Sequence, residues 1–326
     1  MIKSKLRNLK ILFFGLGSIG KKHARIIKDN YHYELYSYRT HKGQEKSDLK
    51  IKEFKNLNDA FSINPDIAFI TNPTYLHVQT ALECVKRNIN LFIEKPVSHS
   101  LEKTNELYNE IRVRKLFTYV AYNMRFNPVL MNLKNIILRE EKPIYFRVTC
   151  SSYLPNWRPK QDYKKSYSAN DNLGGGVILD LSHEFDYISW IIGEIKKIAG
   201  TCGKISNLNI FSEDFIEAQI TCNSNIKGNL HLDCFSKKQE RKIQIYFNDR
   251  YIEGDLINNK IMITTNKEKQ KVLTYKCNLD ESYEKQIKYY FKQYHNNNFN
   301  LMNNFSEALK IFNKIMEFKN MCHYKK

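Results

Sequence analysis

The sequence lacks several features that would assign it to other classes of protein. Its 326 residues contain no apolar run close to the roughly 20 residues that a membrane-spanning helix needs. Its seven cysteines are odd in number and scattered, and no two of them form a C-x-x-C pair. We therefore expect no membrane partner and no metal site, and we interpret the cysteines as reduced thiols of a cytoplasmic protein.

The N-terminus has only part of the pattern of a secretion signal. Basic residues precede the apolar run 11–19, but no small-residue cleavage site follows it, and two lysines come directly after. We therefore expect no signal peptide. Internal repeats and low-complexity linkers are missing as well, since the asparagine-rich segment 296–304 is short enough to be a loop.

Acidic residues are too few to balance the basic ones. The formal net charge is +18, from 52 Lys and Arg against 34 Asp and Glu. A basic surface attracts nucleic acid, but the lysines are spread along the chain, and no arginine-rich arm or known nucleic-acid module is present. We therefore expect no nucleic-acid partner, and we interpret the charge as a field that attracts an anionic small-molecule substrate.

The clearest motif that is present lies near the start of the chain. The apolar stretch 11–14 runs into the loop 15–20, which reads G-L-G-S-I-G, and a helical pattern follows. In a dinucleotide site, Gly15 permits the tight turn, Gly17 lets the backbone approach the pyrophosphate, and Gly20 allows close helix–strand packing. The first amides of the helix then bind the phosphates. The residues that we assign to the cofactor here are Gly15, Gly17, Ser18, Ile19 and Gly20.

Short apolar strands alternate with amphipathic helices from residue 10 to about 120. This alternation is typical of a doubly wound parallel sheet, in which ligands bind outside the carboxyl ends of the strands. We expect strands near 10–15, 33–38, 66–71, 90–94 and 117–121. We expect helices near 18–29, 57–63, 75–88 and 100–114.

The pattern changes at about residue 144, where strand-like runs replace the alternation. Several of these runs read as hairpins, with turn residues at 248–249 and 258–259. One helix is expected near 178–193, and a basic helical tail over 282–321 is expected to pack back. The strand-like runs lie at 144–149, 215–221, 227–235, 242–247, 251–255 and 260–265.

These patterns predict an α/β protein with two domains. The first, over residues 1–122, is a Rossmann domain with a doubly wound parallel sheet. The second, over residues 123–326, is an α+β domain with a large, mostly antiparallel sheet that binds substrate and supports oligomerisation.

Three further motifs follow strand ends or open a helix. Segment 66–74 reads D-I-A-F-I-T-N-P-T, segment 91–96 reads L-F-I-E-K-P, and the glycine-rich segment 174–186 contains Asp180 and His183. Together with the G-x-G-x-x-G loop, and in this order, they resemble the Gfo/Idh/MocA family of NAD(P)-dependent oxidoreductases, which act mostly on sugars and cyclitols. The resemblance covers roughly residues 8–193 by motif, and the remainder by arrangement only.

The resemblance implies catalytic roles for three residues. The lysine of the family's E-K-P motif lies beside the nicotinamide and the reacting carbinol, so Lys95 takes this role, and its ammonium stabilises developing negative charge. His183 matches the family's general acid or base, with Asp180 as the supporting carboxylate. The aspartate stands three residues before the histidine, whereas four are common in the family. Both spacings keep the two side chains on one face of a helix.

The resemblance also extends the cofactor site to the loops after the third and fourth predicted strands. In the family the peptide before the E-K-P proline is often cis. For His77, a packing role at a helix start is an equal alternative. The residues assigned to the cofactor from these loops are Asn72, Pro73, His77, Glu94 and Lys95.

Two segments are candidates for substrate binding. By the resemblance, Asn123 and Arg125 contact the substrate or the nicotinamide side or, equally well, only tie the two domains together. Segment 151–172 is long, aromatic and basic, as expected of a substrate lid. A subunit contact is its alternative, since relatives often dimerise through the open face of the second sheet. The lid residues assigned to the substrate are Trp157, Arg158 and Tyr163.

The end of the second predicted strand bears on the choice between NAD and NADP. An NAD site places an acidic residue about 20 residues past the glycines, where it binds the ribose 2′-hydroxyl. Here that region reads Y-S-Y-R-T over 36–40, without an acid. We therefore expect Arg39 to pair with a 2′-phosphate or stack on adenine, and NADP(H) to bind at least as well as NAD(H).

These observations predict a cytoplasmic, homo-oligomeric oxidoreductase, a dimer or tetramer, that moves a hydride between a sugar hydroxyl carbon and NAD(P). The basic lid favours an acidic or nucleotide-linked sugar, as in surface-polysaccharide biosynthesis. One alternative is a catalytically silent nucleotide-binding regulator or scaffold of the same fold, which the retention of Lys95 and His183 disfavours. Another is an enzyme for a non-sugar carbonyl such as a linear tetrapyrrole, which would not need His183.

Overall fold

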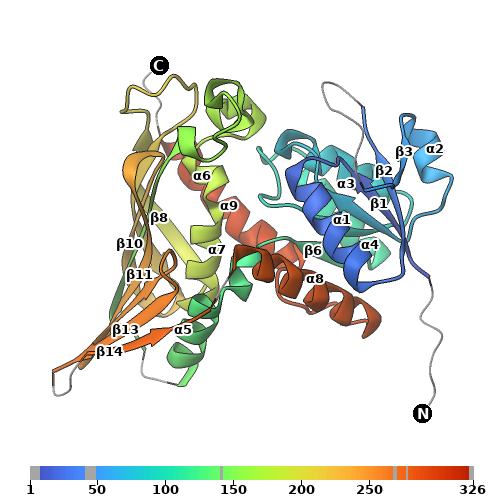
Figure 1. Cartoon of the computed structure of the whole chain (residues 1–326). Helices are drawn as coiled ribbons and strands as arrows, with labels where there is room; N and C mark the ends of the chain where they lie inside the picture. The colour runs from blue at the N-terminus through green and yellow to red at the C-terminus, as the bar shows by residue number, and fades with distance from the viewer. Residues whose placement is uncertain (1–7, 41–48, 140–141, 267–269, 277, 323–326) are drawn as a thin grey trace, which may run out of the picture. The chain divides into compact units, whose positions relative to one another are not determined.

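The computed structural model describes residues 8–40, 49–139, 142–266, 270–276 and 278–322 (Figure 1). The chain divides into two compact units, each made of two separate stretches of sequence. The first unit consists of Met1–Ala121 and Tyr283–Glu307, and the second of Tyr122–Ser282 and Ala308–Lys326.

The first unit contains a parallel sheet of six strands in the order β3-β2-β1-β4-β5-β6. The strand order reverses between β1 and β4, which is the point where a doubly wound sheet binds its ligand. The strands are β1 (Lys10–Phe14), β2 (Glu34–Tyr38), β3 (Lys52–Phe54), β4 (Ile67–Ile70), β5 (Asn90–Ile93) and β6 (Thr118–Val120). The helices are α1 (Ser18–Asn30), α2 (Leu57–Phe61), η1 (Thr74–Leu76), α3 (His77–Val85) and α4 (Thr104–Arg114).

Every strand and helix predicted for this region is confirmed within a few residues. The strands β1, β4 and β5 were recognisable because they are short, mostly buried apolar runs. β3, which reads K-E-F, was not predicted. It is a three-residue strand at the edge of the sheet and is only partly buried. Such a strand has neither the length nor the apolar run of its neighbours.

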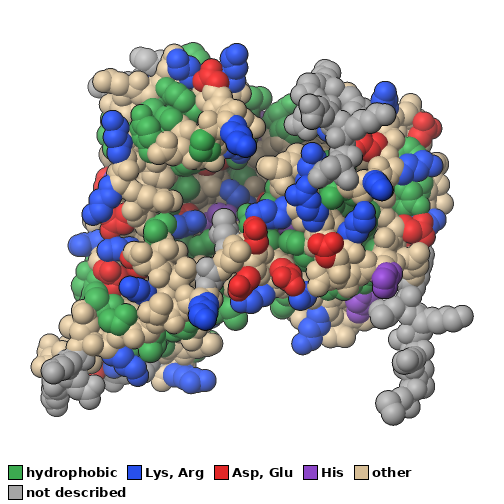
Figure 2. Space-filling model, viewed as in Figure 1, with side chains coloured by type: hydrophobic (Ala, Val, Ile, Leu, Met, Phe, Trp, Pro, Cys, Tyr) green, Lys and Arg blue, Asp and Glu red, His purple; other side chains and the backbone are tan. Residues whose placement is uncertain are grey.

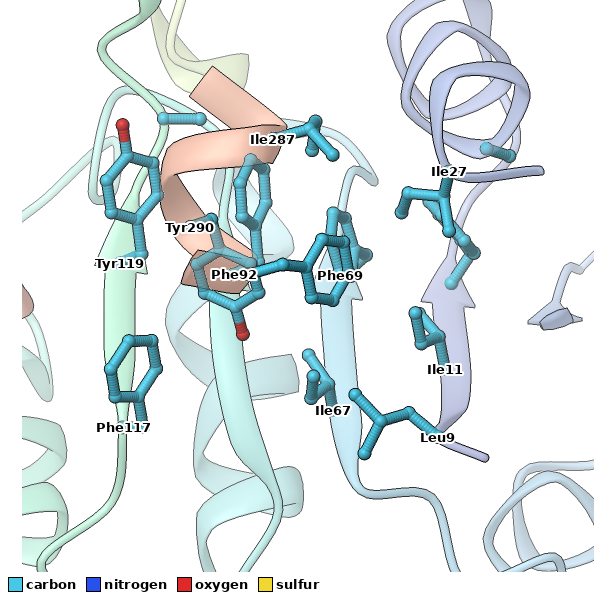
Figure 3. Packing of buried hydrophobic residues seen from close by; sticks show 14 of the residues in the cluster. Leu9, Ile11, Ile27, Ile67, Phe69, Phe92, Phe117, Tyr119, Ile287 and Tyr290 are labelled. Carbon is cyan, nitrogen blue, oxygen red and sulfur yellow. The ribbon is translucent and has the colours of Figure 1, made fainter. Parts of the chain in front are cut away.

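The core of the first unit includes a helix from near the C-terminus. Phe69 and Phe92 stack with ring centroids 4.3 Å apart, and the Tyr290 ring meets Phe92 edge-on at 5.2 Å (Figure 3). Tyr290 lies on α8 (Leu279–His295), and both Tyr290 and Phe291 are buried against the sheet. The sequence analysis placed all residues after 122 in the second domain, whereas the structure groups Tyr283–Glu307 with the first unit.

The loop after α8 protects the edge of this sheet. The Val120 amide on β6 donates to the Asn303 carbonyl at 2.8 Å, and the Phe305 amide donates to the Thr118 hydroxyl at 3.2 Å. An exposed strand edge offers unpaired backbone groups to other chains, so this cover satisfies them. The loop separates α8 from α9 (Phe305–Met321), so the predicted helical tail consists of two helices.

The second unit contains a sheet of eight strands in the order β14-β13-β12-β11-β7-β10-β9-β8. Among the described strands of this sheet, only β7 and β10 pair in parallel. Buried and exposed residues alternate along strands such as β9, which gives the sheet one apolar face. The strands are β7 (Tyr145–Tyr153), β8 (Ile195–Gly203), β9 (Phe215–Cys222), β10 (Lys227–Asp233), β11 (Phe235–Tyr246), β12 (Arg250–Asp255), β13 (Lys260–Thr265) and β14 (Lys271–Thr274).

The helices of this unit lie along one side of the sheet (Figure 1). They are α5 (Pro128–Arg139), α6 (Val177–Asp180), α7 (Ser182–Ile191) and most of α9. The predicted fold class, a Rossmann sheet followed by a mostly antiparallel sheet, is confirmed. The sequence analysis missed α5 and the two edge strands β8 and β14.

The expectation of reduced thiols is wrong for one pair of cysteines. Cys202, on β8, and Cys322, directly after α9, form a disulfide with their Cα atoms 5.6 Å apart. Four further cysteines are buried free thiols, and Cys277 lies outside the described residues. The free thiols are Cys84, Cys150, Cys222 and Cys234.

Two kinds of feature are absent from the described residues. No helix among them is long and apolar enough to cross a membrane. Within the same part of the chain, no three His, Cys, Asp or Glu side chains come together in a way that could hold a metal ion.

Candidate active site

The glycine loop of the first unit has room where a dinucleotide needs it. Gly15 has φ +94°, and a Cβ there would lie 3.1 Å from the backbone of residues 71–72. A Cβ on Gly20 would lie 2.5 Å from the Gly15 carbonyl oxygen, which is the close helix–strand packing that the motif predicts. A Cβ on Gly17 would meet nothing within 4 Å. Open space at Gly17, at the N-terminus of α1, fits a pyrophosphate bound by the first amides of the helix.

The loop after β4 is tied to the glycine loop and to the segment after β5. The Thr71 hydroxyl donates to the Gly15 carbonyl at 2.6 Å, and the Asn72 side-chain amide donates to the Thr80 hydroxyl at 2.9 Å. The buried ring of His77 lies between two carbonyls, with Nδ1 2.9 Å from the Pro96 oxygen and Nε2 3.0 Å from the Asn72 oxygen. Burial lowers the pKa of His77, and the two backbone contacts oppose this shift.

The E-K-P motif follows directly after β5, and the Lys95–Pro96 peptide is cis, as the family resemblance implies. Lys95 is half-buried. The carboxylate of the preceding residue, Glu94, lies 2.6 Å from Nε2 of His23 on α1 and accepts the Lys95 amide at 3.2 Å. Because β1, β4 and β5 are parallel neighbours, their carboxyl ends bring the glycine loop, the His77 loop and Lys95 to one edge of the sheet.

Arg39, expected to meet the cofactor, is held by an acid that sequence reasoning missed. Nη1 of Arg39 donates to both carboxylate oxygens of Glu53, at 2.9 and 3.1 Å, and the arginine is only 5% exposed. Glu53 lies on β3, where it pairs with Ser37 of β2. An acid therefore does stand near the end of β2, but the neighbouring strand supplies it. The sequence feature that could have revealed Glu53 is the K-E-F strand, which is too short and too polar to be recognised as a strand.

In the second unit, the helix that carries the predicted acid–base pair is interrupted. Asp180 is the last residue of α6, and α7 begins at Ser182, so the expected continuous helix over 178–193 is corrected to two helices. Asp180 and His183 therefore lie on different helices, and helical spacing no longer sets their relative orientation. His183 is half-buried, and its ring packs edge-on against Tyr122 at 5.7 Å.

Asp180 is instead associated with the predicted lid. Its carboxylate raises the pKa of the Tyr167 hydroxyl, burial of Tyr167 adds to this shift, and Arg158 opposes it. The guanidinium of Arg158 stands over the Tyr167 ring, 5.0 Å from its centroid. The structure thus joins two predicted site residues, Asp180 and Arg158, through Tyr167, a residue of the lid segment 151–172 that was given no role of its own from the sequence.

Two ion pairs, each formed by a buried acid, fix α7 on either side of His183. Glu184 accepts from Arg241 at 2.7 Å, and Asp186 forms two hydrogen bonds with Arg125, at 2.7 and 3.0 Å. Both acids are fully buried. At the spacing of an α-helix, positions 184 and 186 lie to the two sides of position 183, so the pairs set the rotation of the helix about its axis.

This arrangement places Arg125 and Asn123 inside the second unit. Arg125 is 1% exposed and bound to Asp186, and Asn123 donates to the Ser282 hydroxyl at 2.8 Å with both side chains buried. Both contacts join elements within the second unit, and the expected contact with substrate stays a prediction.

The predicted lid is a chain of short turns. It runs from the end of β7 through η3 (Leu154–Asn156), η4 (Tyr163–Lys165), η5 (Tyr167–Ala169) and η6 (Asp171–Leu173). The Trp157 indole donates to the Ser152 hydroxyl at 3.0 Å, and the Asn209 amide donates to the Tyr163 hydroxyl at 3.4 Å. Trp157, Arg158 and Tyr163 line a recess of about 10 Å³, which is too small for a sugar.

Two models of one protein family match the chain. The model described as "Oxidoreductase family, NAD-binding Rossmann fold" matches residues 9–122, and the "GFO/IDH/MocA C-terminal domain" matches residues 142–253. Together they cover more than half of the chain, and they divide it where its two sheets divide.

Similar proteins include dehydrogenases of inositol and of a nucleotide sugar. The myo-inositol 2-dehydrogenase of Thermotoga maritima is 27% identical over 57% of this chain and 55% of its own length. The UDP-N-acetylglucosamine 3-dehydrogenase of Acidithiobacillus ferrooxidans is 22% identical over 67% of this chain and 64% of its own length. In sequence, the chain thus spans between about half and two thirds of the length of these relatives.

Solved structures resemble the chain over nearly its whole length. The Acidithiobacillus enzyme superposes with a TM-score of 0.79 at 15% identity, covering 96% of this chain and 97% of that one. The WlbA dehydrogenase of Chromobacterium violaceum, in complex with NADH and UDP-GlcNAcA, superposes with a TM-score of 0.80 at 18% identity, covering 96% and 93%. At these identities the likeness concerns the fold.

The open space at Gly17 generates a test of the cofactor site. Gly17→Val should unfold with a free energy within about 1 kcal/mol of wild type, since a side chain there meets no protein atom. It should weaken binding of NADH at least about 100-fold, or about 2.7 kcal/mol, because the side chain occupies the space of the pyrophosphate. Calorimetry and denaturant unfolding measure the two effects.

Gly20→Val is the matched control. Its side chain meets the Gly15 carbonyl, so it should lower the free energy of unfolding by about 1–3 kcal/mol. Unchanged NADH binding by Gly17→Val would show that the pyrophosphate lies elsewhere.

Proposed function

Because the chain belongs to the Gfo/Idh/MocA family of oxidoreductases, we propose that it transfers a hydride between the hydroxyl-bearing carbon of a sugar and a nicotinamide cofactor. One observation carries the proposal. The carboxyl ends of β1, β4 and β5 bring an open glycine loop and a half-buried lysine to the same edge of a parallel sheet. A dinucleotide bound across that edge has its phosphates at one end and a cationic group at the other.

We assign three roles to residues of the first unit. The amides of Ser18 and Ile19 bind the pyrophosphate, and the loop of Asn72 and Pro73 borders the cofactor. The nicotinamide, when bound, accepts or supplies the hydride. The ammonium of Lys95 stabilises the negative charge that develops on the substrate oxygen as its proton leaves.

We assign the proton transfer to a residue of the second unit. His183 is the group that takes the proton from the hydroxyl and returns it, since an imidazole changes charge near neutral pH. The two ion pairs that fix α7 support this role, because a general base must be held in one orientation. Asp180, beside Tyr167, supports the site through that tyrosine and Arg158.

The substrate class that we propose is an acidic or nucleotide-linked sugar. The lid exposes Arg158 and three lysines, and a basic surface raises the encounter rate of an anionic ligand. Figure 2 shows lysine and arginine side chains spread over both units, so the positive charge is not confined to the lid. Relatives named for UDP-N-acetylglucosamine and a relative bound to UDP-GlcNAcA support the same class. A role in surface-polysaccharide biosynthesis, a cytoplasmic location and a homo-oligomer remain predictions.

Substitution of Lys95 tests the proposed chemistry. Lys95→Met should lower kcat for oxidation of a UDP-sugar about 100- to 1,000-fold, because it removes the charge that stabilises the oxyanion. Its Kd for NADH should change less than about threefold, since the lysine does not contact the pyrophosphate. The assay follows NADH formation with a panel of UDP-sugars and free sugars.

Lys86→Met, at an exposed lysine after α3, is the control and should retain wild-type kcat. Full activity of Lys95→Met would remove Lys95 from the mechanism. A wild-type protein that binds NADH but reduces NAD with no sugar of the panel would favour the silent nucleotide-binding regulator.

For the cofactor, we propose NAD(H) in place of the NADP(H) that the sequence favoured. The expectation of NADP(H) depended on Arg39, and Glu53 already compensates its charge. A 2′-phosphate would have to compete with this carboxylate for the same guanidinium. The complexes of relatives with NADH are in line with this choice.

Glu53→Gln tests the cofactor proposal. Without the carboxylate, Arg39 can pair with a 2′-phosphate, so the ratio of kcat/KM for NADP to that for NAD should rise about tenfold, which is about 1.4 kcal/mol. The double variant Glu53→Gln/Arg39→Ala should lose this gain. A wild-type preference for NADP that Glu53→Gln leaves unchanged would contradict the role of the ion pair.

A further inference from the structure

A histidine on the cofactor helix contacts the acid of the E-K-P motif. His23 of α1 is fully buried, and its Nε2 lies 2.6 Å from the Glu94 carboxylate. Its ring packs against Phe92 at 5.1 Å, with the Tyr283 ring at 5.8 Å. Nδ1 of His23 is buried and has no hydrogen-bond partner among the described residues. The geometry therefore assigns the proton to Nε2, which donates to Glu94.

The same carboxylate holds the backbone of Lys95. One oxygen of Glu94 faces His23, and the other accepts the Lys95 amide at 3.2 Å. Glu94 is 8% exposed, so its orientation depends on these partners more than on water. The carboxylate thus connects α1, whose N-terminus we assign to the pyrophosphate, to the residue that we assign to the reacting carbon.

A second buried histidine holds the other side of Lys95. Nδ1 of His77 lies 2.9 Å from the Pro96 carbonyl, and Nε2 lies 3.0 Å from the Asn72 carbonyl. Both oxygens only accept hydrogen bonds, so a neutral ring donates to one of them and the imidazolium to both. In either form His77 fixes the distance between the loop after β4 and the residue that follows Lys95.

We propose that His23 and His77 are positioning residues for Lys95, which fix the backbone immediately before and after it. The inference rests on the proposed function of Lys95. A lysine side chain has many rotamers, so its ammonium can be placed only if its backbone is held. A site that is loose by about 1 Å can lose 100-fold in rate. The two histidines therefore act on kcat through Lys95, and neither has to touch the substrate or the cofactor.

Two variants at His23 separate positioning from packing. His23→Leu removes the donor and should lower kcat about 10- to 100-fold, with KM for the sugar within about threefold of wild type, as for other groups that hold a catalytic residue. His23→Gln carries an amide nitrogen in place of Nε2 and should recover kcat to within about threefold. His77→Leu should lower kcat in the same way. His295→Gln, at an exposed histidine of α8, is the control and should behave as wild type.

A second readout does not depend on a substrate. The rate at which an amine-reactive acetyl ester modifies Lys95, followed by mass spectrometry, should differ at least about threefold between wild type and His23→Leu, while Lys86 reacts equally in both. NADH should protect Lys95 in wild type and protect it less in His23→Leu. If no sugar is oxidised by wild type, the proposed function fails, and this experiment still tests the positioning of Lys95.

The inference is overturned by either of two results. One is a His23→Leu variant with wild-type kcat and wild-type Lys95 modification. The other is that His23→Leu and His23→Gln lose kcat equally and in proportion to their loss of thermal stability. That result would show that His23 has only a packing role. If His23→Leu does not fold, Glu94→Gln, which keeps the shape of the acceptor, must show the same loss of kcat and the same change in Lys95 modification.

Discussion

The proposed site depends first on the parallel pairing of β1, β4 and β5. Parallel neighbours end at the same edge, so the glycine loop, the His77 loop and Lys95 meet there although they are far apart in sequence. The pairing also requires crossover helices, and α1 begins directly after Gly17, at Ser18. Gly20 and Thr71 then hold α1 close to β4, so the open space at Gly17 follows from tight packing on either side of it.

The second unit uses charge to orient one helix. Burying an ion pair costs desolvation energy, and the attraction between the charges offsets this cost only when the geometry is good. Buried ion pairs therefore contribute little to the free energy of folding. Here two of them, Glu184–Arg241 and Asp186–Arg125, hold α7 from both sides. Loss of one partner would leave a buried charge and cost about 3–5 kcal/mol. The orientation of α7, which carries His183, is therefore fixed by ion pairs within the second unit.

Much of this could be predicted from local sequence, and the rest could not. Buried parallel strands are short apolar runs, so β1, β4 and β5 and the loops after them were found. Glu53 was missed because β3 is a partly exposed edge strand. Nothing in the sequence marks the break at Leu181, or tells which core the aromatic face of α8 joins. The Cys202–Cys322 disulfide joins residues 120 positions apart, which spacing alone cannot pair.

A crystal structure of the protein with NADH tests the central claim most directly. The account predicts the pyrophosphate at the amides of Ser18 and Ile19, within about 3 Å, which is the length of a hydrogen bond. It also predicts the nicotinamide ring beside the ammonium of Lys95. A pyrophosphate bound away from the glycine loop, or a nicotinamide out of reach of Lys95, would contradict the account.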